Sequence, residues 1–213
     1  MPKLPNSAYS AIAPVPGSGC GSRRITSPNC LETSSLPALP EGWAWTTLGD
    51  LSSLITSGSR GWKQYYAANG SVFIRAQNLK TDRLELDDVA YVELPSATEG
   101  LRTRVSRDDI LVTITGANVT RSAQVDVDLA EAYVNQHVGL VRLADSRLSD
   151  FVFLVVVCPS HGRKQLKAAA YGAGKPKRLT ENELSDFSRL WHNGCVEAII
   201  EAQDVDRNHS TQV

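Results

Sequence analysis

Two neighbouring stretches, residues 57–66 and 73–79, carry side chains suited to binding an ordered anionic partner. They bring together planar cations, aromatic rings and side-chain amides: Arg60, Trp62, Lys63, Gln64, Tyr65, Arg75, Gln77 and Asn78. Arg pairs with guanine, Asn or Gln pairs with adenine, and aromatic rings stack on bases, so these residue types fit a surface that reads nucleic acid. A hairpin with a half-buried aromatic face would use the same types, and the types alone do not separate the two interpretations.

Further polar positions extend this candidate surface. Asn118 and Arg121 lie in a turn that follows the clearest predicted strand. Gln136 and His137 interrupt an apolar strand with polar groups, which hydrogen bonds to neighbouring loops would equally explain.

A third group of candidates is basic. Residues 151–180 contain no Asp or Glu but six positive charges, three of which are Lys175, Lys177 and Arg178. We expect these three to hold phosphates, which gives affinity without sequence information. A solvated helix face followed by a loop is the alternative explanation for such a charge run.

The sequence offers no catalytic or cofactor motif. The segment 172–176 fails as a phosphate-binding loop, because Ala169 stands at the earlier glycine position and Pro176 follows the lysine. No glycine fingerprint of a dinucleotide fold, acidic-x-Lys triplet or nucleophile elbow is present. His192 and Cys195 lack a second pair of metal ligands nearby. We therefore expect a non-enzymatic chain that holds no cofactor and no metal ion.

The overall composition is that of an ordinary globular protein. The chain has 213 residues, a net charge of −1 and 42% hydrophobic residues. Its four cysteines (Cys20, Cys30, Cys158 and Cys195) form no C-x-x-C pair, which predicts reduced thiols. The longest apolar run, residues 151–158, is too short to cross a bilayer, and the N-terminus lacks the apolar core of a secretory signal. These features predict a cytoplasmic protein without a membrane partner.

Periodicity predicts a strand-rich α+β domain whose helices are mostly in its C-terminal third. Residues 1–38, rich in Pro, Ser and Gly, are expected to form a flexible leader. The predicted strands are 45–48, 72–75, 89–93, 110–115, 122–127 and one long strand at 133–143. The predicted helices are 96–104, 151–157, a helix capped by Ser160 that runs to residue 171, and a short helix that begins with the capping box of Thr180 and Glu183. For 151–157 the β-branched composition also fits a strand and the period does not separate the two; a helix is the favoured interpretation. Trp43, Trp45, Tyr91 and Phe187 are assigned to the core.

Several motifs, taken in order, resemble a known family. They are Leu-Pro-Glu-Gly-Trp at 39–43, the stretches 57–66 and 73–79, the segments 102–104 and 108–116, the segment 133–142, and the segments 172–176 and 179–186. This series resembles the target recognition domain of the DNA specificity subunit of type I restriction–modification systems. The resemblance covers residues 39–186, and although each motif alone is weak, their order and spacing make the combination specific.

The resemblance implies a function. A strand-rich, highly twisted recognition domain of this family reads one half of a bipartite double-stranded DNA target. The specificity subunit is itself non-catalytic. It recruits modification subunits, which methylate adenine with S-adenosylmethionine, and a restriction subunit that uses ATP and Mg²⁺ to translocate and cut DNA.

The sequence departs from the family pattern near its end. Residues 188–195 stand where the family has a proline-rich stretch before a long spacer helix, and residues 196–203 resemble only the beginning of that helix. We therefore divide the chain into a leader (1–38), a recognition domain (39–190) and a truncated spacer start with a polar tail (191–213). Such a chain is either one half of a split subunit, which joins a second half-subunit, or a remnant that acts only through contacts with modification subunits.

Overall fold

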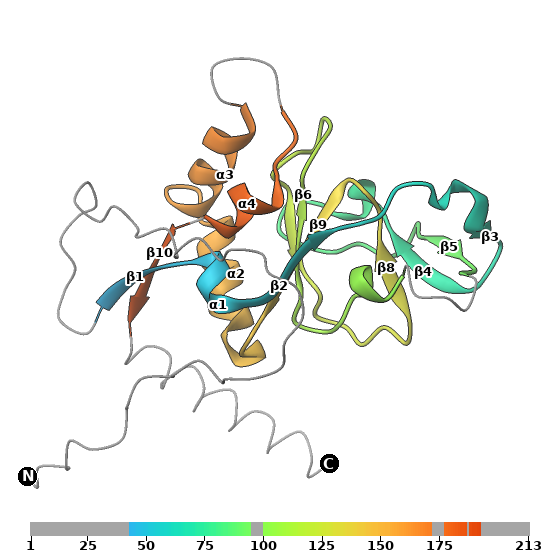
Figure 1. Cartoon of the computed structure of the whole chain (residues 1–213), viewed down its shortest axis with the longest axis horizontal. Helices are drawn as coiled ribbons and strands as arrows, with labels where there is room; N and C mark the ends of the chain where they lie inside the picture. Colours follow the sequence, from blue (N-terminus) through green and yellow to red (C-terminus); the bar gives the residue numbers. More distant parts are fainter. Residues whose placement is uncertain (1–42, 95–99, 172–176, 187, 193–213) are drawn as a thin grey trace, which may run out of the picture. The chain divides into compact units, whose positions relative to one another are not determined.

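The computed structural model describes residues 43–94, 100–171, 177–186 and 188–192. These residues form two four-stranded sheets, a two-stranded pairing and several short helices (Figure 1). The predicted α+β class is confirmed. The expected leader, most of the expected tail and Lys175 lie outside the described residues.

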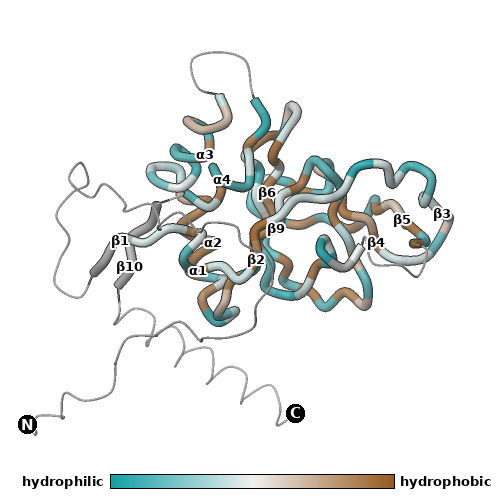
Figure 2. Tube along the Cα trace, viewed as in Figure 1, coloured by the Kyte–Doolittle hydropathy of each residue, from teal (hydrophilic) through white to brown (hydrophobic). Residues whose placement is uncertain are grey.

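The larger core is built around a sheet that we call the central sheet. Its strand order is β2 (Ser52–Ser57), β9 (Val138–Leu143), β6 (Ile110–Thr113) and β7 (Ser122–Gln124), and all its pairs are antiparallel. Ile110 and Val112 pack into one hydrophobic cluster, while Leu111 packs into another on the opposite face. Both faces of β6 are buried, which explains why its sequence is a nearly continuous apolar run. Figure 2 shows hydrophobic colours where β6 and β9 lie.

The second sheet carries the aromatic residues. Its order is β3 (Tyr66–Ala67), β5 (Ala90–Val92), β4 (Ser71–Ile74) and β8 (Ala132–Val134). The pair β4–β8 is parallel, while β5 is antiparallel to both of its neighbours. Trp62, Phe73, Val92 and Tyr133 form a separate buried cluster on this sheet.

The predicted long strand 133–143 is wrong, because the chain there forms two strands in different sheets. β8 ends at Val134 in the second sheet and β9 begins at Val138 in the central sheet. Between them, the Asn135 side-chain oxygen accepts the His137 amide N–H at 3.0 Å, and the Asn135 amide N–H donates to the Ile74 carbonyl at 3.0 Å. An Asn side chain that bonds its own backbone two residues on favours a turn, so the polar interruption marks the change of sheet.

The helices α2 (Ser149–Val157), α3 (Gly162–Tyr171) and α4 (Glu181–Ser185) contribute buried side chains to the hydrophobic cluster on one face of the central sheet. α2 confirms the predicted helix, and its buried Val152 and Val156 lie one turn apart. α3 begins one residue after the start that a Ser160 cap would give. α4 begins with the predicted capping box of Thr180 and Glu183. Among the described residues, every helix is too short or too polar to span a bilayer.

The first described strand pairs with the last. β1 (Trp43–Thr47) is antiparallel to β10 (Ser188–His192), and a short helix α1 (Leu48–Leu51) leads from β1 into β2. The core assignments of Trp43, Trp45 and Phe187 concern side chains outside the described part, whereas Tyr91 is half-buried. Of the predicted helix 96–104, the described part is one 3₁₀ turn at Leu101–Thr103.

Candidate nucleic-acid interface

One end of the central sheet gathers the connections that carry most of the predicted site residues. β2 and β6 run towards this end, while β9 and β7 start from it, because Ser57 lies opposite Gly139 and Thr113 lies opposite Val138. We call it the upper end, as it is in the view of Figure 1. Its connections are residues 58–61, 114–121 and 135–137.

Backbone contacts hold these connections against one another. The Gly58 amide N–H donates to the Val138 carbonyl at 3.2 Å, and a Cβ at Gly58 would lie 2.1 Å from the Asn135 carbonyl. The Ile114 N–H donates to the His137 carbonyl at 2.9 Å. The Leu179 N–H donates to the Ile114 carbonyl at 2.8 Å, which brings the basic segment to the same end.

Arg178 is tied to the start of the first of these connections. Its Nη2 donates to Ser57 Oγ at 3.1 Å, and Ser57 Oγ donates to Glu181 Oε1 at 3.3 Å. Lys177 donates to Glu183. That bond, together with the Thr180 backbone N–H, lowers the pKa of Glu183, so its carboxylate stays charged at neutral pH and offsets the Lys177 charge. Sequence reasoning assigned both cations to phosphates and missed these internal partners.

Three other cations have no neighbouring carboxylate in the described structure that neutralises their charge. Arg60 and Lys63 are exposed and Arg121 is half-buried. Within the described residues, none of the three forms an ion pair with a carboxylate. They leave the upper end with positive charge that is able to attract an anion. Figure 2 shows hydrophilic colours along the segment that leads from β2 to β3 and carries Arg60 and Lys63.

Four further polar candidates lie near these cations in sequence or in the same connections. Gln64 is exposed and belongs to the 3₁₀ turn η2 (Trp62–Tyr65). Asn118 is half-buried in the connection 114–121. Gln136 is half-buried and His137 exposed, with Gln136 Nε2 and His137 Nε2 3.1 Å apart. The structure is compatible with all four as contact residues, and their role stays a prediction.

The distribution of carboxylates is the signal that sequence reasoning missed. Residues 51–81, 110–125 and 132–144, which supply the upper connections, contain no Asp or Glu. The opposite, lower end of the sheet carries many of them: Asp50, Asp108, Asp109, Asp126, Asp128, Asp145 and Asp150. Only the acid-free run 151–180 was recognised from sequence, because the other stretches meet only after the strands pair.

Arg142 and Arg107 at the lower end pair with carboxylates, unlike Arg60, Lys63 and Arg121 at the upper end of the described structure. Arg142 bonds Asp109 with both Nε and Nη2, at 2.8 and 2.7 Å. Burial is the largest influence on Asp109 and raises the pKa of its carboxyl group, although the Arg142 bonds oppose the rise. Arg107 pairs with Asp128 at 3.1 Å. The two ends of the central sheet therefore differ in sign, which gives the domain an oriented electrostatic field.

Trp62 is a correction to the predicted interface. Its side chain is only 2% exposed, its ring stacks on Phe73 with centroids 5.1 Å apart, and Tyr133 meets it edge-on at 5.3 Å. Gly61, with φ of 87°, precedes η2 and directs the chain so that this ring turns inward. Trp62 therefore belongs to the core. For this residue, the alternative interpretation of a hairpin with a buried aromatic face is the correct one. Tyr65 is half-buried against the same cluster, while Tyr66 is 47% exposed.

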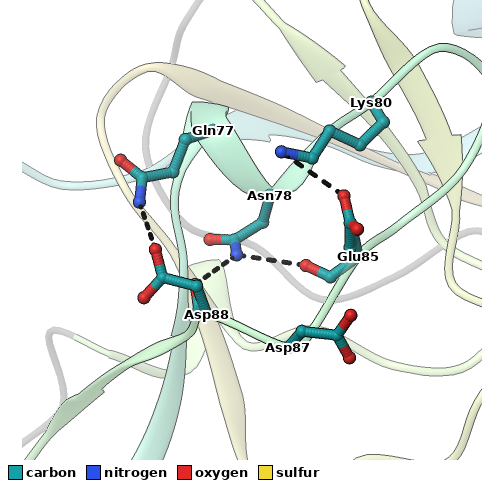
Figure 3. Close-up of a pocket in the computed structure, with 6 residues that line it drawn as sticks. All are labelled: Gln77, Asn78, Lys80, Glu85, Asp87 and Asp88. Carbon is teal, nitrogen blue, oxygen red and sulfur yellow. Dashed lines mark hydrogen bonds and ion pairs between the residues drawn. The ribbon is translucent and has the colours of Figure 1, made fainter.

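Asn78 is a second correction. Its side chain is buried, and its Oδ1 accepts the Arg75 amide N–H at 2.9 Å. Its Nδ2 donates to the carbonyls of Glu85 at 3.1 Å and Asp88 at 2.8 Å (Figure 3). These bonds occupy the amide in shaping the loop between β4 and β5, so it is not available to pair with adenine.

Arg75 and Gln77 are brought together by a carboxylate that was not predicted to matter. Arg75 Nη2 donates to the Asp88 carbonyl at 3.2 Å and lies 3.5 Å from Asp88 Oδ1. Gln77 Nε2 donates to Asp88 Oδ2 at 3.1 Å (Figure 3). Gln77, Asn78 and Asp88 line a surface pocket, and Lys80 and Glu85, which pair at 3.3 Å, line its other side.

The described residues supply no metal centre. Within residues 43–94, 100–171, 177–186 and 188–192, no group of three or more His, Cys, Asp or Glu side chains is arranged to hold a metal ion. The upper end combines unpaired positive charge with side-chain amides that both donate and accept hydrogen bonds.

Comparison with known proteins places this fold. No protein-family model matches the sequence, and no curated protein matches it. Among solved structures, the chain is similar to a chain from a structural study of complex assembly and conformational transition of the type I R-M system. The two chains are 14% identical and have a TM-score of 0.55, and the match covers 82% of this chain and 40% of that chain.

Two further structures agree. The HsdS subunit from Thermoanaerobacter tengcongensis matches with 15% identity and a TM-score of 0.50 over 82% of this chain and 40% of that one. The type I restriction–modification S subunit from M. genitalium matches with 10% identity and a TM-score of 0.51 over 81% and 41%. The chain thus has a fold found in type I specificity subunits and spans about two fifths of their length.

Proposed function

We propose that this chain binds double-stranded DNA in a sequence-dependent manner, as the target-recognition part of a type I restriction–modification specificity subunit. The observation that carries the proposal is the separation of charge between the two ends of the central sheet. At the upper end, Arg60, Lys63 and Arg121 have no carboxylate partner among the described residues, and the nearby carboxylates are Glu181 and Glu183. Most of the carboxylates around the central sheet lie at its lower end. The shared fold with specificity subunits supports the same assignment.

Electrostatic attraction would deliver and orient the domain on the duplex. Lys63 and Arg121 attract phosphates, while the carboxylates of the lower end are repelled by them. Lys175, Lys177 and Arg178 would add phosphate contacts, with Lys177 exchanging Glu183 for a phosphate. The domain would therefore dock with its upper end first.

Sequence would be read by the polar groups that stand among these cations. Gln64, Asn118 and Gln136 have the amides that pair with adenine, and Arg60 has the fork that pairs with guanine. His137 and Tyr65 would add contacts at the margin. One such domain would read one half of a bipartite target.

The assembly around the chain follows from the same proposal. Modification subunits would supply adenine methylation with S-adenosylmethionine, and a restriction subunit would supply ATP- and Mg²⁺-dependent translocation and cleavage. This chain would contribute no catalytic group and no cofactor of its own. A second half-subunit would provide the other recognition domain, and the complex would work in the cytoplasm.

Binding to duplexes tests the proposal. A target is selected from a randomised duplex pool with the full chain, in the presence and absence of a co-expressed modification subunit, and its affinity is compared with that of scrambled duplexes by fluorescence anisotropy. We expect preference for the selected duplex, and Arg60→Ala should reduce that preference. Lys177→Ala should instead weaken all duplexes alike.

Equal affinity for selected and scrambled duplexes under both conditions would contradict the proposal. Capture of a modification subunit by a chain that binds no duplex would favour the alternative, a protein-interaction remnant. Identical effects of the Arg60 and Lys177 variants would contradict the division between reading and phosphate contact.

A further inference from the structure

Asp88 joins the head groups of two side chains that are suited to base recognition. Its Oδ2 accepts from Gln77 Nε2 at 3.1 Å, while Arg75 Nη2 lies 3.5 Å from Oδ1 and donates to the Asp88 carbonyl at 3.2 Å. Figure 3 shows the Gln77 amide directed at this carboxylate. Asn78 donates to the same carbonyl and so fixes the backbone of Asp88 beneath both groups. Asp88 thus holds Gln77 through its carboxylate, and Arg75 through both its carboxylate and its backbone carbonyl.

The carboxylate is exposed although it is paired. The Asp88 side chain is 85% exposed, whereas that of Arg75 is 24% exposed and its Nε is buried without a hydrogen-bond partner in the described structure. A surface ion pair with so exposed a partner adds little to stability. Its consequence is geometric, because it limits where the Arg75 and Gln77 head groups can point.

This group begins beside the upper end of the central sheet. β4 and β8 are parallel and end together at Ile74 and Val134. The Asn135 amide N–H then donates to the Ile74 carbonyl, so Arg75 follows directly next to the connection 135–137. An exposed carboxylate in this position disfavours a phosphate, while the donors it holds remain able to meet a base edge.

We propose that Asp88 is a specificity-determining residue of the DNA interface. It positions Arg75 and Gln77 for a base edge, and its charge keeps the phosphate backbone away from them. This inference rests on the proposed DNA-binding function. It concerns what the interface rejects as well as what it attracts, since discrimination also comes from contacts that disfavour the wrong partner.

The test compares Asp88→Asn with wild type on the selected and scrambled duplexes. The substitution keeps the shape and an acceptor oxygen but removes the charge. We expect scrambled duplexes to bind about twofold tighter or more at low salt, since one repelling charge is gone. We expect the preference for the selected duplex to fall by roughly tenfold, which is within the range that a single bidentate base pairing contributes.

A matched control exists at the lower end. Asp128 is 83% exposed and also pairs with an arginine, Arg107, at 3.1 Å. Asp128→Asn makes the same change of net charge in a similar setting. The inference predicts no change in preference for this variant and a smaller gain on scrambled duplexes.

Each outcome decides between the proposals. Unchanged binding of Asp88→Asn to both duplexes, or equal effects of the Asp88 and Asp128 variants, would overturn the role of Asp88 and leave DNA binding standing. Absence of duplex binding by the wild-type chain would overturn both proposals. Gln77→Ala gives a second readout, in which preference falls without any gain on scrambled duplexes; a gain there would count against the positioning role.

Discussion

Trp62 shows how a residue type can indicate one role and perform another. In sequence it stands between Arg60 and Lys63, where an aromatic ring would suit base stacking. In the structure it is the centre of the aromatic cluster with Phe73 and Tyr133. The chain turns at Gly61, with φ of 87°, and the ring then packs against Phe73 and Tyr133. Periodicity carries no information on such a turn within a loop.

Truncation of this ring should therefore affect stability before it affects binding. We predict that Trp62→Ala lowers the free energy of unfolding by about 3–5 kcal/mol, as for large aromatic residues in cores. Chemical denaturation measures the loss, and Trp62→Phe, which keeps a ring in the cluster, should lose less. A Trp62→Ala variant that is fully stable but no longer binds duplexes would contradict the assignment to the core.

Asn78 offers a second prediction at the scale of a single residue. Replacement by Ala leaves the Arg75 amide and two carbonyls without their side-chain partner. We predict a loss of about 1–3 kcal/mol in unfolding free energy, because the partners of a buried hydrogen-bonding group become unsatisfied. Asn78→Asp, which keeps one acceptor, should recover the bond to the Arg75 amide but not the two bonds from Nδ2. A neutral effect of Asn78→Ala in denaturation would show that the loop does not depend on it.

At the scale of elements, the connection 58–61 depends on the close packing of two backbones. A Cβ at Gly58 would lie 2.1 Å from the Asn135 carbonyl, whereas a Cβ at Gly61 would meet nothing within 4 Å. We predict that Gly58→Ala separates the two upper connections and weakens both duplex binding and thermal stability. Gly61→Ala should cost only the strain of its left-handed backbone, about 1 kcal/mol.

These two glycine variants are measured together by thermal unfolding and duplex affinity. Equal losses for both would mean that backbone strain, and not the contact with Asn135, determines the conformation of this connection. A loss confined to Gly58→Ala would support the upper end as one packed unit.

Prediction from sequence succeeded for elements and was limited for the site. The capping box at Thr180 was readable because it depends on residues close in the chain, whereas the favoured helix at 151–157, confirmed as α2, had a composition that also fitted a strand. The change of sheet at Asn135 was not readable, since both halves of the segment 133–143 have strand character and only pairing with different partners separates them. The site residue Arg178 acquired a partner distant in sequence, Ser57, and Gln77 acquired one across the loop between β4 and β5, Asp88.

At the scale of the whole molecule, the two ends of the central sheet have opposite charge although the net charge is −1. Net charge alone would argue against a nucleic-acid partner. The acid-free segments 51–81, 110–125 and 132–144 combine at one end only because alternate strands of an antiparallel sheet turn there. Charge pattern therefore becomes informative when it is assigned to sheet ends and not summed over the chain.

The lower end has its own structural requirement. Asp109 is 1% exposed and receives two bonds from Arg142. We predict that Arg142→Ala lowers the unfolding free energy by about 3 kcal/mol or more, because it leaves a buried carboxylate unpaired. Denaturant titration measures this, and duplex affinity of the folded variant should be unchanged. If the Arg142→Ala variant kept full stability but lost duplex binding, DNA would bind the lower end, which contradicts the proposed upper-end interface.

The salt dependence of duplex binding tests the central claim most directly. Two triple variants have the same net charge. The upper-end variant combines Arg60→Ala, Lys63→Ala and Arg121→Ala. The lower-end variant combines Arg107→Ala and Arg147→Ala, which remove the partners of Asp128 and Asp145, with Arg104→Ala, a residue whose carbonyl accepts from Arg142. We predict that the upper-end variant reduces the slope of log affinity against log salt by about 0.9 for each phosphate that the protein no longer neutralises, while the lower-end variant keeps the wild-type slope. Equal slopes in the two variants, or a larger reduction from the lower end, would contradict binding of DNA at the upper end.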